Sequence, residues 1–246
     1  MTTLTTRLES GESFKVVMLL YPGVTQLDLT GPAEVFGRVR GVSVDLAWKN
    51  TEPVTAAAIT PPGMRFVPSV SFAEVERADL LCVPGGPGHL EMLADDEVLG
   101  FLRRIATTAR YITSVCTGSL LLGAAGLLEG YRAATHWNSM QFLDRFGAIP
   151  VEQRVVIDRN RITGGGVTAG IDFGLHVIRE LWGLRSAEMA QLTIEYDPQP
   201  PTTSGSPRTA SPELVARAQQ VMAAYTTRQR AFIDAALARR SRDADG

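Results

Sequence analysis

Two cysteines are the candidates for nucleophilic chemistry in this 246-residue chain, and their local settings differ. Cys116 stands between an apolar run, residues 111–115, and a segment of small and apolar residues, 119–125. This is the strand-to-helix position at which a tight turn holds a reactive atom clear of a sheet. The N–H groups of a helix N-terminus favour the thiolate, which is the form that attacks carbon. Cys116 is therefore interpreted as a candidate nucleophile. The alternative is a small buried hydrophobic residue, the usual role of a free cysteine.

Cys82 lies inside an apolar run, residues 80–83, where a central strand surrounds the side chain with other side chains. We interpret it as inert core packing. Two cysteines 34 positions apart form no disulfide framework, and without further thiols or a clustered histidine pair they form no zinc site.

A glycine-rich loop, residues 84–88, follows the strand that contains Cys82. Parallel sheets bind their ligands at the carboxyl ends of strands, and glycines let backbone N–H groups approach a ligand closely. Gly85 and Gly86, together with the N–H of Thr117, are candidates for an anion-stabilising pocket beside the sulfur. Gly118 allows the following helix to come close. The alternative interpretation of the loop is a tight turn without a binding role.

Asp28 is the third candidate, because apolar residues flank it on both sides just past the first strand. Partial desolvation would raise the pKa of its carboxyl and make a proton available near neutral pH. The alternative role is capping of the helix that the Thr-Gly-Pro sequence at residues 30–32 is expected to start. The local sequence leaves both roles open.

The three histidines carry less information. His136 is expected to line the site, and His89 to cap a turn after the glycine loop. His176 lies in the middle of a predicted helix between apolar residues and is expected to be a core histidine. No pair has metal-ligand spacing on one helix, and the Gly-x-Ser-x-Gly sequence of serine hydrolases is absent. Neither a phosphate loop nor a dinucleotide fingerprint occurs, which argues against nucleotide binding.

The elements that position these residues alternate between strand and helix, which predicts an α/β fold with a parallel sheet covered by helices on both faces. An excursion at residues 54–67 has the character of a hairpin, and residues 155–162 form a short strand pair before a triple-glycine turn. The predicted strands are residues 14–21, 42–48, 79–84 and 111–115. The predicted helices are residues 32–38, 97–110, 119–125, 169–182 and 186–196.

The C-terminal part differs from the rest of the chain. Residues 197–212 hold five of the 14 prolines and predict a connection without regular structure. A last helix then starts at Ser211 and Pro212 and must bury an apolar stripe on its own domain or on a second subunit. We therefore expect a leader at residues 1–13, a catalytic domain at 14–196, and an arm at 197–246. The stripe consists of Leu214, Ala218, Val221, Met222, Tyr225, Phe232, Ile233, Ala236 and Leu237.

The composition excludes several classes of protein. The 24 basic and 26 acidic side chains give no positive field for phosphates or anionic lipid, so nucleic acid and membrane surfaces are not expected partners. The longest apolar runs, such as residues 120–128, are shorter than the roughly 20 residues that span a bilayer. Residues 1–13 lack the apolar centre of a signal peptide, which predicts a cytoplasmic protein.

Four segments together resemble the DJ-1/PfpI superfamily, and within it the branch that hydrates isonitriles. They are residues 27–32, 84–86, 114–119 and 163–166. The likeness extends over residues 14–196 and continues into the arm. It implies a flavodoxin-like domain of the class I glutamine amidotransferase type and a homodimer. It also implies hydration of an isonitrile to an N-substituted formamide without a metal or an organic cofactor.

The resemblance also assigns residues. Cys116 matches the nucleophile, Asp28 its acidic partner, and Thr117 the residue whose backbone and hydroxyl face the site. Many relatives carry glutamate in place of Asp28, and the shorter aspartate agrees with the hydratase branch. Thr117 replaces the histidine of the intracellular-protease branch, which argues against peptide hydrolysis.

Other sibling families fit less well. Glutamine amidotransferases carry a late His-x-Glu pair, and neither His136 nor His176 is followed two places on by glutamate. The arm holds one helix rather than a helix-turn-helix domain. Two rival functions remain. One is a glyoxalase- or deglycase-like enzyme for reactive carbonyls, and the other is a non-enzymatic sensor that uses oxidation of Cys116.

Overall fold

A sheet of seven strands forms the centre of the molecule. The computed structural model describes residue 8, residues 11–58 and residues 62–244. The strands are β1 (Phe14–Leu19), β2 (Val42–Trp48), β5 (Val70–Ser71), β6 (Leu80–Val83), β7 (Tyr111–Val115), β10 (Val155–Asp158) and β11 (Arg161–Gly164). Their order is β10-β11-β7-β6-β1-β2-β5, and every neighbouring pair is parallel except β10 with β11.

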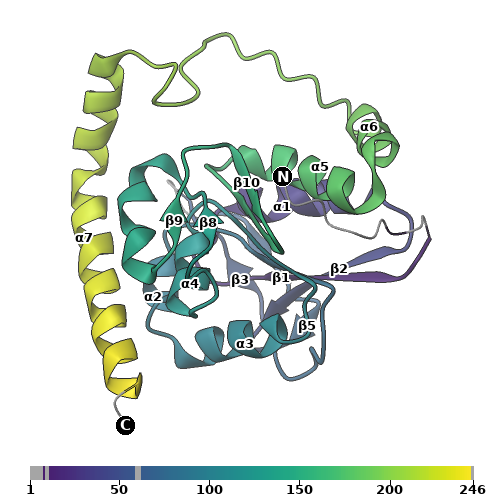
Figure 1. Cartoon of the computed structure of the whole chain (residues 1–246), viewed down its shortest axis with the longest axis horizontal. Helices are drawn as coiled ribbons and strands as arrows, with labels where there is room; N and C mark the ends of the chain where they lie inside the picture. Colours follow the sequence, from purple (N-terminus) through teal and green to yellow (C-terminus); the bar gives the residue numbers. More distant parts are fainter. Residues whose placement is uncertain (1–7, 9–10, 59–61, 245–246) are drawn as a thin grey trace.

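Helices cover both faces of this sheet (Figure 1). One face carries α1 (Gln26–Phe36), α5 (Ala169–Trp182) and α6 (Leu184–Thr193). The other carries α2 (His89–Met92), α3 (Asp96–Ala106) and α4 (Gly118–Ala124). The predicted α/β class, with a mostly parallel sheet between two layers of helices, is confirmed.

Smaller elements fill the loops. The pair β3 (Val54–Thr55) and β4 (Arg65–Phe66) is antiparallel, which confirms the hairpin character of the excursion. A second pair joins β8 (Arg132–Ala133) to β9 (Ile149–Pro150), with the 3-10 helices η1 (Trp137–Phe142) and η2 (Asp144–Phe146) between them. The elements β8, β9, η1, η2, α2 and β5 carry too few residues for a periodic pattern, so sequence alone did not predict them.

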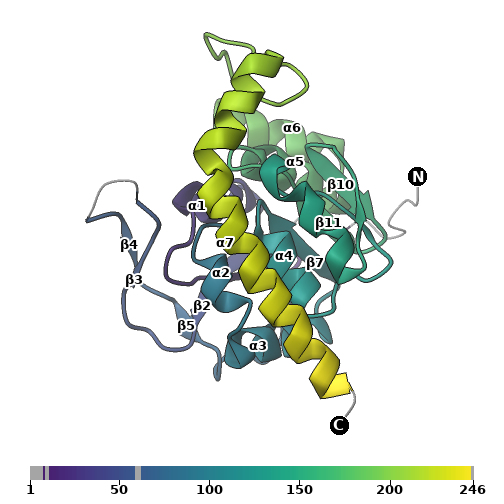
Figure 2. The ribbon, with the colours of Figure 1, turned by 90° about the vertical axis from the view of Figure 1, so that its left-hand side faces the viewer.

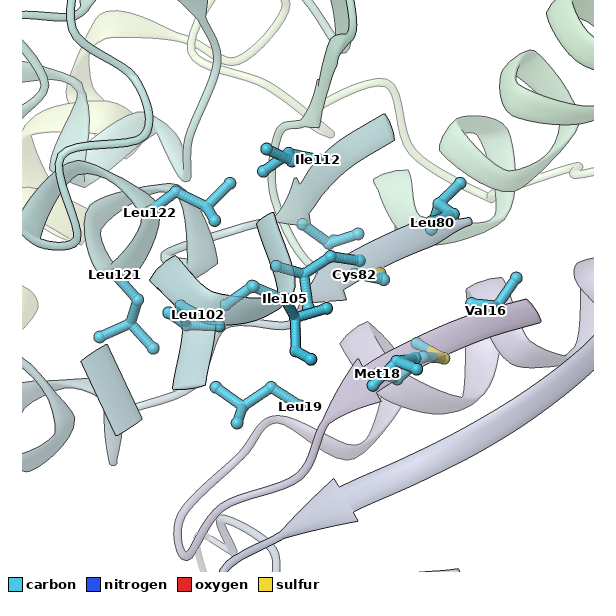
Figure 3. Close-up of a cluster of buried hydrophobic side chains, with 14 of the residues drawn as sticks. Val16, Met18, Leu19, Leu80, Cys82, Leu102, Ile105, Ile112, Leu121 and Leu122 are labelled. Carbon is cyan, nitrogen blue, oxygen red and sulfur yellow. The ribbon is translucent and has the colours of Figure 1, made fainter. Parts of the chain in front are cut away.

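The strands predicted from apolar or alternating patterns are all present, each with bounds within two residues of the prediction. β2, β7 and α5 have the predicted bounds, and the strand pair predicted at residues 155–162 is present and extends to residue 164. Figure 3 shows buried hydrophobic side chains of the core, with Met18 of β1 and Cys82 of β6 among them and Ile105 contributed by α3. Cys82 is fully buried there, as expected.

The predicted start of the first helix was wrong. Residues 32–38 were expected to form it, with proline at the first helical position, but α1 begins at Gln26 after Thr25, and Pro32 lies inside it. Tertiary packing outweighs the local signal here. A Cβ atom at Gly170 of α5 would lie 3.0 Å from Pro32 Cδ, so α1 and α5 pack closely at this proline. The earlier start places Asp28 in the first turn of α1.

The arm consists of an irregular connection, residues 197–211, and the long helix α7 (Pro212–Ala244), as predicted. In the single chain α7 lies against its own body and crosses α2 and α4 (Figure 2). The apolar stripe is only partly covered. Ile233 is fully buried, whereas Val221 is 71% exposed.

The amino-terminal segment lies largely outside the described residues, which omit 1–7 and 9–10. Leu8 is described. Its N–H donates to the carbonyl of Leu181 at 2.8 Å, and its side chain is buried. This contact ties residue 8 to the end of α5.

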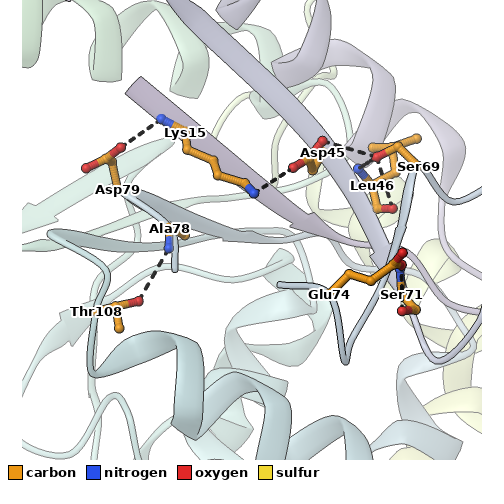
Figure 4. A network of polar contacts seen from close by, with 9 residues as sticks. All are labelled: Lys15, Asp45, Leu46, Ser69, Ser71, Glu74, Ala78, Asp79 and Thr108. Carbon is orange, nitrogen blue, oxygen red and sulfur yellow. Dashed lines mark hydrogen bonds and ion pairs between the residues drawn. The ribbon is translucent and has the colours of Figure 1, made fainter. Parts of the chain in front are cut away.

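Polar contacts join the strands at the edge of the sheet where β1 and β6 begin (Figure 4). The N–H of Lys15 donates to Asp79 Oδ2 at 2.8 Å, and its ammonium forms an ion pair with Asp45 at 3.1 Å. These contacts fix the amino ends of β1, β2 and β6. The candidate catalytic residues lie at the opposite, carboxyl ends of the strands, where open α/β sheets bind ligands.

Candidate active site

Cys116 occupies the sharp turn between β7 and α4. Its φ angle is 55°, a left-handed conformation that non-glycine residues rarely adopt and that clusters at functional sites. The surroundings hold it there. Its N–H donates to Gly164 and Gly165 at 3.1 and 2.7 Å, and its carbonyl accepts from the hydroxyls of Ser119 and Thr135 at 3.1 and 2.9 Å. Four hydrogen bonds therefore fix the backbone of this cysteine.

Asp28 approaches the sulfur from the first turn of α1. Its side chain is fully buried, and Oδ2 accepts the N–H of Gly85 at 3.0 Å. Oδ1 is buried with no hydrogen bond of ordinary geometry to any of the described residues, yet the carboxyl lies close enough to Cys116 for each group to affect the pKa of the other. Burial raises the pKa of Asp28 to about 7, and the contacts with Cys116 and Gly85 oppose part of that rise.

The glycine loop joins Asp28 to Thr117. The N–H of Gly86 donates to Thr117 Oγ1 at 3.1 Å, as that of Gly85 does to Asp28. A Cβ atom at Gly85 would lie 2.5 Å from the nitrogen of Thr117 and 2.8 Å from Asp28 Oδ2. One at Gly118 would lie 1.9 Å from the carbonyl oxygen of Val83. Both positions therefore require glycine, and the two loop N–H groups orient an acid and a hydroxyl.

The pKa of the Cys116 thiol is raised well above its ordinary value, chiefly by burial and then by the negative charge of Asp28. The N–H and hydroxyl of Thr117 act in the opposite direction and favour the thiolate. The helix N-terminal effect that the sequence suggested is thus present but smaller than desolvation. Near neutral pH, Asp28 is the group that titrates, and the thiol keeps its proton until a base removes it.

His136 lies one step further out. It precedes η1, where its Nδ1 accepts the N–H of Asn138 at 3.3 Å, and burial lowers its pKa. It lines a cavity of about 720 Å³ together with Thr135 and Gly165, the residues that hold the backbone of Cys116. Apolar side chains, among them Trp137, form part of the same wall. His136 therefore lines a cavity whose wall includes two residues that hydrogen-bond the backbone of Cys116, whereas Cys116 and Asp28 are not part of that wall.

The structure thus brings six candidate residues together at one site and leaves His136 on a cavity beside it. The six are Cys116, Asp28, Thr117, Gly85, Gly86 and Gly118. His176 lies apart from them, half-buried on α5.

Sequence analysis did not single out several residues that support the site. Thr135 holds the Cys116 carbonyl, and the hydroxyl of Tyr21 donates to Pro84 at 2.9 Å, at the start of the glycine loop. His89 begins α2, near the turn it was expected to cap, and its Nδ1 lies 2.7 Å from the carbonyl of Gly86. For Tyr21, the only signal in the local sequence is its position just after the end of β1.

Among the described residues, no group of three or more histidine, cysteine, aspartate or glutamate side chains is arranged to hold a metal ion. No helix in the described part of the chain is both long and apolar enough to cross a membrane.

Comparison with known proteins places this site in context. Residues 14–180 match the DJ-1/PfpI family. The isonitrile hydratase of Pseudomonas putida is 48% identical over 208 residues, which cover 85% of this chain and 90% of that protein. A crystal structure of a ThiJ/PfpI family protein from Pseudomonas syringae has a TM-score of 0.86 at 44% identity, covering 91% of this chain and 92% of that one. DJ-1beta of Drosophila melanogaster shares the fold, with a TM-score of 0.67 at 23% identity over 76% of this chain and 100% of its own.

Proposed function

Because the chain belongs to the DJ-1/PfpI family, we propose that it is an isonitrile hydratase, an enzyme that adds water to an isonitrile to give an N-substituted formamide. The observation that carries the proposal is the buried pair of Asp28 and Cys116, found in a chain 48% identical to a hydratase over most of its length. A terminal isonitrile carbon must receive both a nucleophile and a proton, and this pair offers one of each.

In the first step the carboxylate of Asp28 takes the proton of the Cys116 thiol. The thiolate forms a C–S bond to the terminal carbon of the isonitrile, and Asp28 returns the proton to the same carbon. The product is a thioimidate in which the former isonitrile carbon carries sulfur, hydrogen and a double bond to nitrogen. A pKa of about 7 suits a carboxyl group that both accepts and donates a proton near neutral pH.

In the second step water adds to the thioimidate carbon, one of its protons passes to the nitrogen, and Asp28 accepts the other as base. Breaking the C–S bond then forms the carbonyl of the formamide, and the departing sulfur recovers its proton from Asp28. The sum of both steps is isonitrile plus water giving formamide, with enzyme unchanged. No group outside the chain is needed to balance it.

The other candidate residues act by position. Gly85 and Gly86 orient Asp28 and the Thr117 hydroxyl, whereas Gly118 lets α4 approach β6. The N–H of Thr117 stabilises negative charge on the sulfur. His136 faces the adjoining cavity, whose partly apolar wall suits the hydrocarbon group of a neutral substrate.

We extend the proposal to organisation. Residues 14–196 form the catalytic domain and residues 197–246 the arm. Two copies form a homodimer in the cytoplasm, as in the branch that the sequence resembles. The near-balanced charge supports a small-molecule enzyme with no nucleic-acid partner. The molar mass, measured by light scattering as the protein elutes from a size-exclusion column, tests the dimer.

The function is tested by incubating the purified protein with an alkyl isonitrile and, separately, with methylglyoxal. We expect formamide from the first and no lactate from the second. Lactate without formamide would favour the glyoxalase-like alternative. Neither product, together with ready oxidation of Cys116 by peroxide, would favour the redox sensor.

A further inference from the structure

The helix α7 is fastened to the segments that build the active site. On its buried side, Gln229 is fully buried, and its Oε1 accepts the hydroxyl of Ser139 at 3.1 Å. Asn138 donates to the hydroxyl of Thr226 at 2.8 Å. Figure 2 shows α7 crossing in front of α2, which follows the glycine loop. The polar contacts of α7 therefore fall on residues next to the catalytic segments.

The hydrogen bonds of His89 define its tautomer. Nδ1 lies 2.7 Å from the carbonyl of Gly86, which only accepts, so Nδ1 carries the proton. Burial lowers the pKa of His89 to about 4, so the ring is neutral and Nε2 is an acceptor. Nε2 lies 3.1 Å from Nε2 of Gln229, which donates to it while Oε1 of the same amide accepts from Ser139. Each hydrogen bond in the series from Gln229 through His89 to Gly86 therefore has one donor and one acceptor, and the direction of each bond is fixed.

This direction leaves the hydroxyl proton of Tyr225 without an acceptor among the described residues. The oxygen of Tyr225 lies 3.5 Å from Nδ1 of His89, but Nδ1 already carries a proton and cannot accept another. The rings of the two residues meet edge to face. The phenol is half-buried, and both burial and the neighbouring Cys116 raise its pKa, so it stays protonated. A neutral O–H donor therefore stands beside His89, whose partner Gly86 donates to Thr117, the residue next to the nucleophile. Its hydrogen has no acceptor among the described residues.

We propose that the hydroxyl of Tyr225, held near Cys116 by α7, donates a hydrogen bond to the nitrogen of the thioimidate formed on that cysteine. This inference rests on the proposed hydratase function. A hydrogen bond to that nitrogen draws electron density from the neighbouring carbon and makes it a better target for water. An isonitrile nitrogen has no free lone pair, so Tyr225 acts on the second step and not on the first.

The experiment compares Tyr225→Phe with wild type in steady-state hydration of an alkyl isonitrile. Phenylalanine keeps the ring and removes the donor, so the melting temperature stays unchanged. We expect kcat to fall about 10²-fold, as for loss of one preorganised donor. KM falls with it while kcat/KM changes little, because slow hydrolysis makes the thioimidate accumulate. Mass spectrometry of the quenched protein should then find Cys116 carrying the mass of one substrate.

A matched control is Tyr131→Phe, which makes the same chemical change at a tyrosine beside Arg159 and Arg161. It should match wild type in kcat and in adduct level. Unchanged kcat in Tyr225→Phe would overturn the inference, as would a fall in kcat with constant KM and no adduct. Both results would leave the hydratase function intact. A wild-type protein that hydrates no isonitrile would overturn the function and the inference together.

Discussion

Cys82 lies on β6 and Cys116 directly follows the neighbouring parallel strand β7; both are buried, and burial raises the pKa of both thiols. Cys82 lies within β6, where its pKa rises to about 12 and Thr113 opposes the rise only in part. Cys116 comes one residue after the end of β7, in a left-handed conformation, with Asp28 and the N–H of Thr117 at its sulfur. Burial is common to both, so it is the position at the strand end that brings an acid and a donor to one of them.

The strongest test of this comparison exchanges each cysteine for alanine. Cys116→Ala should abolish hydration and keep the fold, because no other described side chain offers a nucleophile beside Asp28. Cys82→Ala should keep the rate within a small factor and lose about 1 kcal/mol of stability, as for a modest loss of core packing. Formamide production and chemical denaturation measure both. Full activity in Cys116→Ala would remove the mechanism.

The next test removes the proton donor. Asp28→Asn keeps the size of the side chain but transfers no proton, so kcat should fall at least about 10²-fold. Substrate binding should weaken much less, because the contact with the N–H of Gly85 is retained through the amide oxygen. Initial rates from pH 5 to 9 give both constants. Turnover equal to wild type would reduce Asp28 to a structural residue of α1.

A third test targets the glycine loop. Gly85→Ala places a methyl group 2.5 Å from the nitrogen of Thr117 and should shift it or Asp28, with a loss of about 10²-fold in kcat/KM. Gly100→Ala is the matched control, because a Cβ atom there meets nothing within 4 Å inside α3. The control should keep full activity and gain up to about 1 kcal/mol of helix stability. An active Gly85→Ala would show that the loop tolerates a side chain.

The last test concerns the dependence of stability on pH. Asp28 has a pKa of about 7 in the folded protein and 3.8 as an ordinary carboxyl. The folded state therefore binds the proton more tightly, and stability is lost as pH rises from about 4 to 7. The difference of roughly three pH units corresponds to about 4 kcal/mol at most. Unfolding of wild type and Asp28→Asn between pH 4.5 and 8 should show the variant gaining relative stability with pH. Parallel curves would contradict the raised pKa.

Local sequence predicted the parts of the fold that local forces determine. The alternating pattern of β2, the buried strand β7 and the periodic pattern of α5 have the predicted bounds. The start of α1 was predicted six residues late, because Pro32 is a strong local signal that packing against α5 overrides. The exposure of Val221 likewise follows from how α7 seats on the body, which an apolar pattern alone does not specify.

The residues of the candidate site also divide into those that the local sequence predicted and those that it did not. Cys116, Asp28 and the glycine loop stand at strand or helix ends, and short motifs mark all three. The contact of Gln229 with His89 joins residues 140 positions apart, and that of Asn138 with Thr226 joins residues 88 apart. No local pattern encodes such pairs, because they depend on where a separate helix docks.

The connection at residues 197–211 determines how strongly α7 stays docked on the body of the protein. A connection of this length spans at most about 50 Å even when fully extended, and short tethers give effective concentrations in the millimolar range. Contacts that would be weak between separate molecules are therefore mostly formed in the intact chain. A single proteolytic cut in this segment would turn the docking of α7 into a bimolecular equilibrium, and the helix would then depart on dilution.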